Sequence, residues 1–234
     1  MRYKQFKVLT FDLDDTLWEC LPVIEKADIK LRTWLETHYP KITSKYTNDA
    51  FFDYRTNIVN NHPEYAHDFS FIRQTQLLNI ALDSGYTQNI AEKVRDLGFE
   101  VFITERSNVE LYDDVIPSFK ILCKYFRLGA LTNGNVDLSK TDLNSYFNFT
   151  LNAVTAGCAK PDSRFFQHAC NLANVEASEI LHIGDHPIHD INGAIQAGLK
   201  TVWLNRNNKK WPDLPKPDNI IYSLNELPDL LLNN

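Results

Sequence analysis

Two aspartates at the end of an apolar run are the residues of this chain best suited to chemistry. The apolar run at residues 8–11 is followed by Asp12, Asp14 and Asp15, and then by Thr16. A short, continuous apolar run is typical of a buried parallel strand. Asp12 and Asp14 are two positions apart, so on an extended backbone both side chains point to the same face. Adjacent carboxylates repel each other unless a cation or a proton separates them, although an acidic turn or a helix N-cap also fits this stretch.

Three later segments also place polar residues where apolar runs end. They are Thr132-Asn133-Gly134, Lys160-Pro161, and Gly184-Asp185 with Asp190 five residues further on. Because the carboxyl ends of parallel strands open on one crevice, we expect these segments to converge with the acidic tip. Several carboxylates, one lysine, a hydroxyl group and glycine-containing turns fit a phosphate held by a hard cation, and Mg²⁺ prefers such oxygen ligands.

The elements that must position these residues follow from the hydrophobic pattern. Beyond about residue 113 the chain alternates between runs of strand length and segments of helical period. The pattern predicts helices at 116–125 and around 165–173, a helix that stops at Gly198, and strands at 128–131, near 149–154, at 180–183, at 201–204 and at 219–222. Such alternation indicates an α/β fold with a mostly parallel sheet and right-handed crossovers.

Residues 18–111 have a different pattern, with apolar residues at helical spacing and helix ends expected at Gly85 and, after a helix at 89–97, at Gly98. One strand precedes this block and several follow it. We therefore expect a core domain made of residues 1–17 and 112–234, with residues 18–111 inserted as a helical domain.

Composition excludes several classes of protein. The 234 residues carry 24 Lys and Arg against 30 Asp and Glu, a formal charge of −6, which argues against a general nucleic-acid-binding surface. No apolar stretch reaches the ~18 residues of a membrane span, and the first strand begins too early for a signal peptide. The four cysteines are scattered, as in a reduced cytoplasmic protein.

The four motifs, in this order, resemble those of the haloacid dehalogenase superfamily, and the resemblance covers nearly the whole chain. It implies a Rossmann-like core with an inserted helical cap of the C1 type. It further implies a Mg²⁺-dependent phosphatase that acts on a small phosphorylated metabolite, without nucleic-acid or membrane partners, as a monomer or small homo-oligomer.

The resemblance also assigns roles to individual residues. Asp12 would be the nucleophile that forms an aspartyl-phosphate, and Asp14 the general acid and base. Lys160 would pair with Asp12 and the phosphate. Asp12, the backbone carbonyl of Asp14, and Asp185 would bind Mg²⁺.

The remaining site residues would support these groups. Thr132 and the amides of Asn133 and Gly134 would hold the phosphate oxygens that are not transferred. Thr16 would support the site. Asp190 would orient Lys160 or a metal-bound water.

The acidic residue at position 14 favours phosphoester hydrolysis over dehalogenation. Dehalogenases of the superfamily carry a non-acidic residue there, because a halide leaves without a proton. The motifs are similar to those of the bacterial flavin mononucleotide phosphatase branch, so that nucleotide is the first substrate candidate, ahead of other nucleotide or sugar phosphates. Two alternatives stay open: a phosphotransferase such as a mutase, and a non-catalytic phosphate-binding or regulatory module.

Several other polar residues have structural interpretations. Asp113 and Asp114 are expected at the surface of a turn, and Arg73 on a solvated helix face. Trp18 is expected to pack in the core or at the hinge, and His182 to be a hydrogen-bonded core histidine.

Overall fold

The computed structural model describes residues 6–233, and this part of the chain divides into two compact units. One unit, here called the core unit, contains the described residues 6–19, 110–134 and 142–233. The other, the helical unit, contains residues 20–109 and 135–141. The segment 135–141, which the sequence pattern leaves in the core, groups with the helices because the Asp137 amide donates to Ser107 Oγ at 2.9 Å and Asn135 Nδ2 donates to Ser70 Oγ at 3.2 Å.

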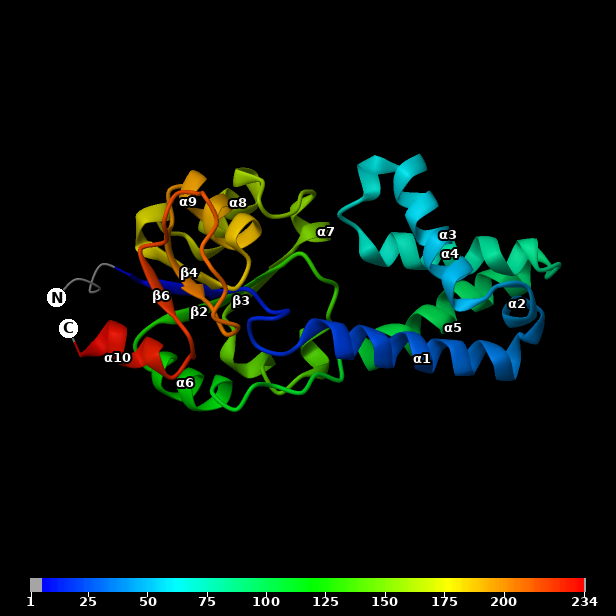
Figure 1. Ribbon diagram of the computed structural model, residues 1–234, viewed down its shortest axis with the longest axis horizontal. Helices are drawn as coiled ribbons and strands as arrows, with labels where there is room; N and C mark the ends of the chain where they lie inside the picture. Colours follow the sequence, from blue (N-terminus) through cyan, green and yellow to red (C-terminus); the bar gives the residue numbers. More distant parts are fainter. Residues whose placement is uncertain (1–5, 234) are drawn as a thin grey trace. The chain divides into compact units, whose positions relative to one another are not determined.

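The core unit is built on a six-stranded sheet in which every pair of neighbouring strands is parallel (Figure 1). The strands lie in the order β3-β2-β1-β4-β5-β6. Their bounds are β1 Val8–Phe11, β2 Arg127–Thr132, β3 Phe149–Asn152, β4 Ile180–Gly184, β5 Lys200–Leu204 and β6 Asn219–Ile221. The α/β fold class expected from the sequence is therefore confirmed.

Helices cover both faces of this sheet, with α8 and α9 on one side and α6 and α10 on the other (Figure 1). The helices of the core unit are α6 Val115–Leu122, α7 Ala153–Ala156, α8 Ser163–Ala173, α9 Gly193–Gln196 and α10 Glu226–Leu232. A π-helical segment, Pro187–Asn192, precedes α9, and two 3₁₀ turns lie at Asn144–Tyr146 and Ala177–Glu179. Strand β1 is central and buried throughout, because sheets covered on both faces bury every strand position.

The strand expected near 149–154 is two residues shorter than predicted. Asn152 ends β3 and caps α7, since its side chain accepts a hydrogen bond from the Thr155 amide at 2.9 Å, while the Thr155 hydroxyl accepts one from the Asn152 amide at 3.2 Å. This capping box turns residues 153 and 154 into the first turn of a helix.

The helical unit consists of α1 Cys20–His38, α2 Pro40–Lys45, α3 Asn48–Asn61, α4 Phe69–Asp83 and α5 Gln88–Arg106, with 3₁₀ turns at Pro63–Tyr65 and Leu138–Lys140. The prediction that a helix ends before Gly98 is wrong, because α5 continues to Arg106. A Cβ at position 98 would lie 3.2 Å from both Leu77 Cδ1 and Trp34 Cζ3. The glycine thus allows close packing against α1 and α4 and does not end the helix. Within residues 6–233, no helix is long and apolar enough to cross a membrane.

The expectation that Asp114 lies at the surface is wrong. The residue is only 7% exposed, and its side chain accepts hydrogen bonds from both Nη atoms of Arg206 at 2.8 Å, from Ser223 Oγ at 2.7 Å and from the Leu224 amide at 2.8 Å. Burial opposes the charged form, but these donors outweigh it and hold the pKa of Asp114 below its ordinary value.

Arg206 also connects this carboxylate to the acidic loop. Its Nε and Nη2 donate to the carbonyl oxygen of Thr16 at 3.2 and 3.0 Å, and its guanidinium lies 4.0 Å from the centre of the Tyr112 ring. Arg206 therefore holds together two segments of the core unit, the one at Thr16, where the chain leaves this unit, and the one at Asp114, where it has returned.

We expect Asp114→Asn to destabilise the protein by about 2 kcal/mol, since the partly buried Arg206 guanidinium and two neutral donors lose a charged acceptor. Because the folded pKa of Asp114 is depressed, its contribution is present at neutral pH and is lost as pH falls through that folded value. Urea unfolding at several pH values measures both effects, with exposed Asp113→Asn as the matched control. A stability difference between wild type and Asp114→Asn that is unchanged well below pH ~3.9 would contradict the argument.

Candidate active site

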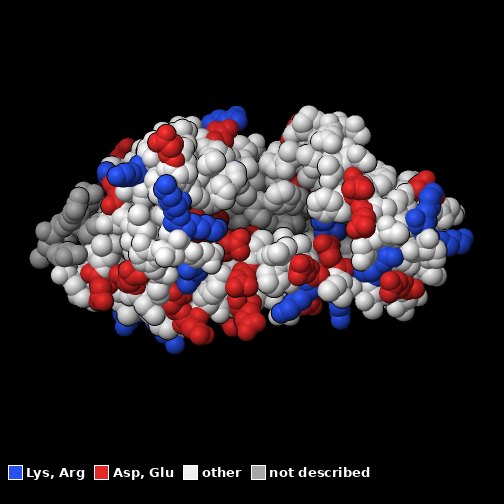
Figure 2. Space-filling view, viewed as in Figure 1, with Lys and Arg blue, Asp and Glu red and all other residues white. Residues whose placement is uncertain are grey.

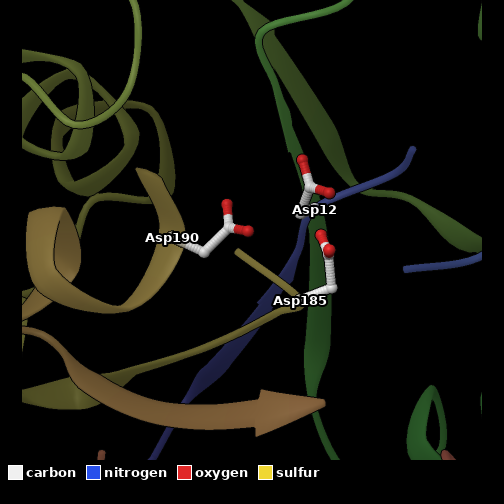
Figure 3. A group of neighbouring side chains, drawn as sticks. All are labelled: Asp12, Asp185 and Asp190. Atoms are coloured by element: carbon white, nitrogen blue, oxygen red, sulfur yellow. The ribbon is translucent and has the colours of Figure 1, made fainter. Parts of the chain in front are cut away.

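The carboxyl ends of the central strands bring the polar motifs of the core unit together. Asp12 directly follows β1, and its amide donates to the carbonyl oxygen of Ile183 on β4 at 2.9 Å. Asp185 directly follows β4. Figure 3 shows the carboxylates of Asp12, Asp185 and Asp190 gathered at this edge of the sheet. Residues 173 positions apart in sequence thus meet because their strands are neighbours in register.

The ammonium group of Lys160 is buried at the centre of this site. Its Nζ lies 2.6 Å from Asp12 Oδ1, 2.6 Å from Asp190 Oδ1 and 2.7 Å from the carbonyl oxygen of Leu131. Only 1% of the side chain is exposed. Since an ammonium has three donors, all three are used, and the lysine is held in one position.

Three carboxylates form an acidic cluster around this cation. One oxygen each from Asp12, Asp185 and Asp190 can be chosen such that all lie within 4.8 Å of one another. The Thr16 hydroxyl lies between two of them, 3.1 Å from Asp12 Oδ2 and 3.5 Å from Asp185 Oδ1. The cluster therefore carries more negative charge than Lys160 alone can balance.

The pKa values show this imbalance. Burial, together with the charge of Asp190, raises the pKa of Asp12 well above its ordinary value despite Lys160. Burial and the neighbouring charges of Asp190 and Asp15 raise the pKa of Asp185 to about 7. Burial also works against the charged forms of Lys160 and Asp190, but their mutual attraction prevails, so the pKa of Lys160 is raised and that of Asp190 is lowered.

The donor set of this cluster fits a hard divalent cation. Asp190 is already paired with Lys160, whereas Asp12 and Asp185 are the two carboxylates whose ionised forms lack sufficient positive charge. Mg²⁺ is commonly bound by one or two carboxylates, with water and a phosphate completing its shell. Asp12 and Asp185 are thus the side chains that would hold such an ion.

The motif at the end of β2 is hydrogen-bonded to the backbone of Lys160. The Asn133 side chain donates to the carbonyl oxygen of Lys160 at 2.9 Å and accepts from the Lys160 amide at 2.8 Å. The Gly134 amide donates to Thr132 Oγ1 at 2.8 Å. Thr132 and Asn133 are therefore brought to the site, with the Asn133 side chain acting on the Lys160 backbone.

Asp14 lies at the edge of the site beside a buried tryptophan. Trp18 Nε1 donates to Asp14 Oδ1 at 2.8 Å, and the Asp15 amide donates to the Trp18 carbonyl at 2.7 Å. Asp15 has a positive φ of 61°, which lets the loop turn back on itself. Trp18 is fully buried, as expected for core packing, but it also orients Asp14, and only the four-residue separation could have suggested this.

Asp190 is held by a buried network that the motifs do not reveal. His182 Nε2 lies 3.5 Å from Asp190 Oδ1, and the His186 amide donates to Asp190 Oδ2 at 2.9 Å. His182 Nδ1 lies 2.9 Å from Thr10 Oγ1. A carboxylate only accepts, so Nε2 carries the proton and Nδ1 accepts from Thr10. Burial lowers the pKa of His182, which keeps the ring neutral.

Gly184 belongs to the Gly184-Asp185 motif, but the motif alone does not show what this glycine does at the site. A Cβ built at this position would lie 2.4 Å from Asp190 Cγ and 2.6 Å from Asp190 Oδ2. The Asp190 carboxylate therefore occupies the volume that any other side chain would fill. The signal in the sequence is a glycine at the last position of a buried strand, directly before Asp185.

The fold and site agree with the family comparisons. A family model for haloacid dehalogenase-like hydrolases matches residues 6–198. The chain is 31% identical over 204 residues to 5-amino-6-(5-phospho-D-ribitylamino)uracil phosphatase YigB of Escherichia coli (strain K12), covering 87% of this chain and 85% of that protein. It is 26% identical to the N-acylneuraminate-9-phosphatase of Mus musculus, over 99% of this chain and 96% of that protein.

Among solved structures, 2-haloacid dehalogenase from Pseudomonas syringae pv. Tomato DC3000 superimposes with a TM-score of 0.93 at 38% identity, over 97% of this chain and 99% of that chain. The protein belongs to the haloacid dehalogenase-like hydrolase family. The recognition of a phosphatase of this superfamily from its motifs is thus confirmed.

We expect Gly184→Ala to lower phosphatase turnover by about 10²-fold, because displacing Asp190 by ~1 Å also moves the Lys160 ammonium. Gly157→Ala is the control: a Cβ there meets no atom within 4 Å, although its φ of 67° makes alanine cost ~1 kcal/mol of stability. Steady-state phosphate release and thermal unfolding separate the two effects. Equal loss of activity in both variants would show that Asp190 placement is not responsible.

Proposed function

We propose that the protein is a Mg²⁺-dependent phosphomonoester hydrolase that works through an aspartyl-phosphate on Asp12. The observation that carries this proposal is the contact of Lys160 with Asp12 and Asp190 inside a cluster of three carboxylates. Lys160 alone does not balance the negative charge of this cluster, so a further cation would stabilise it. A bound Mg²⁺ would neutralise the carboxylates and polarise a phosphoryl oxygen. Asp12, Asp185 and the backbone carbonyl of Asp14 are the groups proposed to hold it.

The chain's own residues account for the transfer step. Asp12 Oδ attacks phosphorus, the bond from phosphorus to the ester oxygen breaks, and the leaving oxygen takes the proton of Asp14. Lys160, together with the proposed Mg²⁺, would favour the ionised form of Asp12 and offset the negative charge of the transition state. Thr132 and the amides of Asn133 and Gly134 would hold the oxygens that are not transferred, which requires the Gly134 amide to exchange its bond to Thr132 for one to the phosphate.

Hydrolysis of the intermediate reverses these proton transfers. Asp14, now a carboxylate, removes a proton from water, whose oxygen attacks phosphorus and releases Asp12 and inorganic phosphate. Thr16 donates to Asp12, and Asp190 orients Lys160, so both support the nucleophile.

The substrate is proposed to be a small phosphorylated metabolite. The names of the relatives include phosphatases of a ribitylaminouracil phosphate and of a sugar acid phosphate. Flavin mononucleotide remains our first candidate, followed by other nucleotide or sugar phosphates. On the face drawn in Figure 2, Lys and Arg side chains are interspersed with Asp and Glu, which does not favour nucleic acid as a partner. We propose action in the cytoplasm as a monomer or small homo-oligomer.

Dehalogenation is the alternative raised by the Pseudomonas syringae structure. A halide leaves without a proton, so an acid at position 14 would have no task in that reaction. A phosphotransferase would release no phosphate without an acceptor sugar, and a regulatory module would have no turnover. Phosphate and halide assays on the same protein separate these possibilities.

Wild-type protein with Mg²⁺ is expected to release phosphate from p-nitrophenyl phosphate, and Asp12→Asn to lower kcat by at least ~10⁴-fold, because an amide is a far weaker nucleophile than a carboxylate. Chelation of Mg²⁺ should also abolish turnover, and readdition should restore it. Asp113→Asn serves as the folded, active control. Unchanged turnover in Asp12→Asn, or halide release from a 2-haloacid without phosphate release, would refute the proposal.

Asp14→Asn is expected to lower kcat/KM for an alkyl phosphate by ~10²- to 10⁴-fold, the range for loss of a general acid. The loss for p-nitrophenyl phosphate should be at least ~10-fold smaller, because nitrophenolate leaves without a proton. Since kcat/KM reports on the first transfer step, the comparison isolates the acid role. Equal losses for both esters would assign Asp14 a structural role.

A further inference from the structure

The indole of Trp18 holds the carboxylate of Asp14, although none of the motifs gives this tryptophan a chemical role. Its Nε1 donates to Asp14 Oδ1 at 2.8 Å. Trp18 is fully buried, at 0% exposure, whereas Asp14 is partly exposed. The donor therefore belongs to the packed interior of the core unit, and its acceptor belongs to the edge of the site.

The backbone of Trp18 is fixed by pairing with two neighbouring segments. Trp18 forms a parallel bridge with Asp14 and an antiparallel bridge with Leu111, in the segment where the chain re-enters the core unit. The Asp15 amide also donates to the Trp18 carbonyl oxygen at 2.7 Å. Because the backbone and the ring are both held, the direction of the Nε1–H bond is defined before a substrate binds.

The acidic loop uses the same spacing for both of its proposed reactive carboxylates. Thr16 Oγ1 donates to Asp12 Oδ2 at 3.1 Å, and Trp18 Nε1 donates to Asp14 Oδ1. In each pair the donor follows its carboxylate by four residues. One loop thus orients both the proposed nucleophile and the proposed acid, and Trp18 is the counterpart of Thr16.

The hydrogen bond from the indole also distinguishes the two oxygens of the Asp14 carboxyl group. An indole N–H donates and does not accept, so Oδ1 is the acceptor in either protonation state. A protonated carboxyl group has a single O–H donor, and its carbonyl oxygen is the better acceptor. The proton of the neutral acid therefore resides on Oδ2.

This hydrogen bond gains strength as Asp14 gives up its proton. A hydrogen bond to an ionised acceptor is roughly twice as strong as one between neutral groups. Negative charge develops on Asp14 while the leaving oxygen takes the proton, so the added strength appears in the transition state and not in the bound ester. The effect is absent for a leaving group that departs without a proton.

We propose that Trp18 is a positioning residue for proton transfer by Asp14. The Nε1–H bond to Oδ1 directs Oδ2 at the leaving oxygen. The O–H bond at Oδ2 breaks as the bond from hydrogen to the leaving oxygen forms, and the indole proton is not transferred. In the second step Oδ2 takes a proton from water. This role rests on the proposed function, in which Asp14 is the general acid and base.

The alternative is a purely structural contact, because a buried indole N–H needs an acceptor wherever it lies. Trp203 provides the matched control. It is also almost fully buried, and its Nε1 donates to the carbonyl oxygen of Asp185 at 2.7 Å. Trp203→Phe therefore removes a similar hydrogen bond beside the same site, at a backbone carbonyl instead of the Asp14 carboxylate.

The test measures kcat/KM for phenyl phosphate and p-nitrophenyl phosphate, which are similar in shape. Phenolate, with a pKa of ~10, needs a proton to leave at neutral pH, whereas nitrophenolate does not. Trp18→Phe is expected to lower kcat/KM about tenfold for phenyl phosphate, as for loss of one hydrogen bond to a developing charge, and less than threefold for p-nitrophenyl phosphate. Trp203→Phe should lower both values equally.

Urea unfolding shows whether each variant is folded in the assay. If Trp18→Phe is not, Trp18→benzothienylalanine takes its place, because sulfur then replaces the N–H group in a ring of nearly the same shape. The same dependence on the ester is expected. Equal losses with the two esters in the Trp18 variant, or the same ester dependence in Trp203→Phe, would overturn the proposal.

A double-mutant cycle separates an effect through Asp14 from a general effect on packing. In an Asp14→Ala background, Trp18→Phe should lower kcat/KM for phenyl phosphate by less than a further twofold, because its partner is already gone. Losses that multiply in the double variant would show that Trp18 acts independently of Asp14, and the proposal would be wrong.

Other outcomes concern the proposed function itself. If wild type hydrolyses neither ester, the phosphatase proposal fails. If Asp14→Asn loses equal activity with both esters, Asp14 is not the general acid, and the role of Trp18 fails with it. If Asp14→Asn shows the ester dependence and the Trp18 variant does not, only the role of Trp18 is refuted.

Discussion

The site depends on one buried cation, the ammonium group of Lys160, held between Asp12 and Asp190. Removing one partner from a buried ion pair costs several kcal/mol, because the other charge is left without compensation in a medium that solvates it poorly. Lys160, Asp12 and Asp190 must therefore be present together. The carbonyl oxygen of Leu131 completes the set of acceptors, so the end of β2 also contributes to the placement of the lysine.

The parallel sheet makes this arrangement possible at low cost. Strand β1 pairs with β2 on one side and β4 on the other, so three strand ends meet without any long loop. Gly184 leaves space for the Asp190 carboxylate, and the neutral His182 ring connects that carboxylate to Thr10 on β1. The buried strands that form the core therefore also bring the reactive groups within hydrogen-bonding distance of one another.

Charge at the site is unevenly distributed, and this unevenness is what favours a divalent cation. Lys160 stabilises Asp190 as an anion. The ionised forms of Asp12 and Asp185, by contrast, are disfavoured by burial and by the negative charge of Asp190. In the helical unit, the buried guanidinium of Arg73, whose side chain is only 4% exposed, is balanced by Asp28 at 2.6 Å, so its expected place on a solvated helix face is wrong.

The sequence by itself determined the α/β class, the order of strands and helices beyond residue 113, and Asp12, Asp14, Lys160 and Asp185 as the candidate reactive groups. These features are readable because strand and helix periods are local, and because polar residues after an apolar run mark a strand end. Only the tertiary structure decided that Asp114 is buried against Arg206, that Arg73 is buried against Asp28, and that α5 continues through Gly98. In each case the outcome depends on a partner many residues away, so local periodicity carries no information about it. Burial of a charge is decided by whether its counterion reaches it, and that is a property of the folded chain.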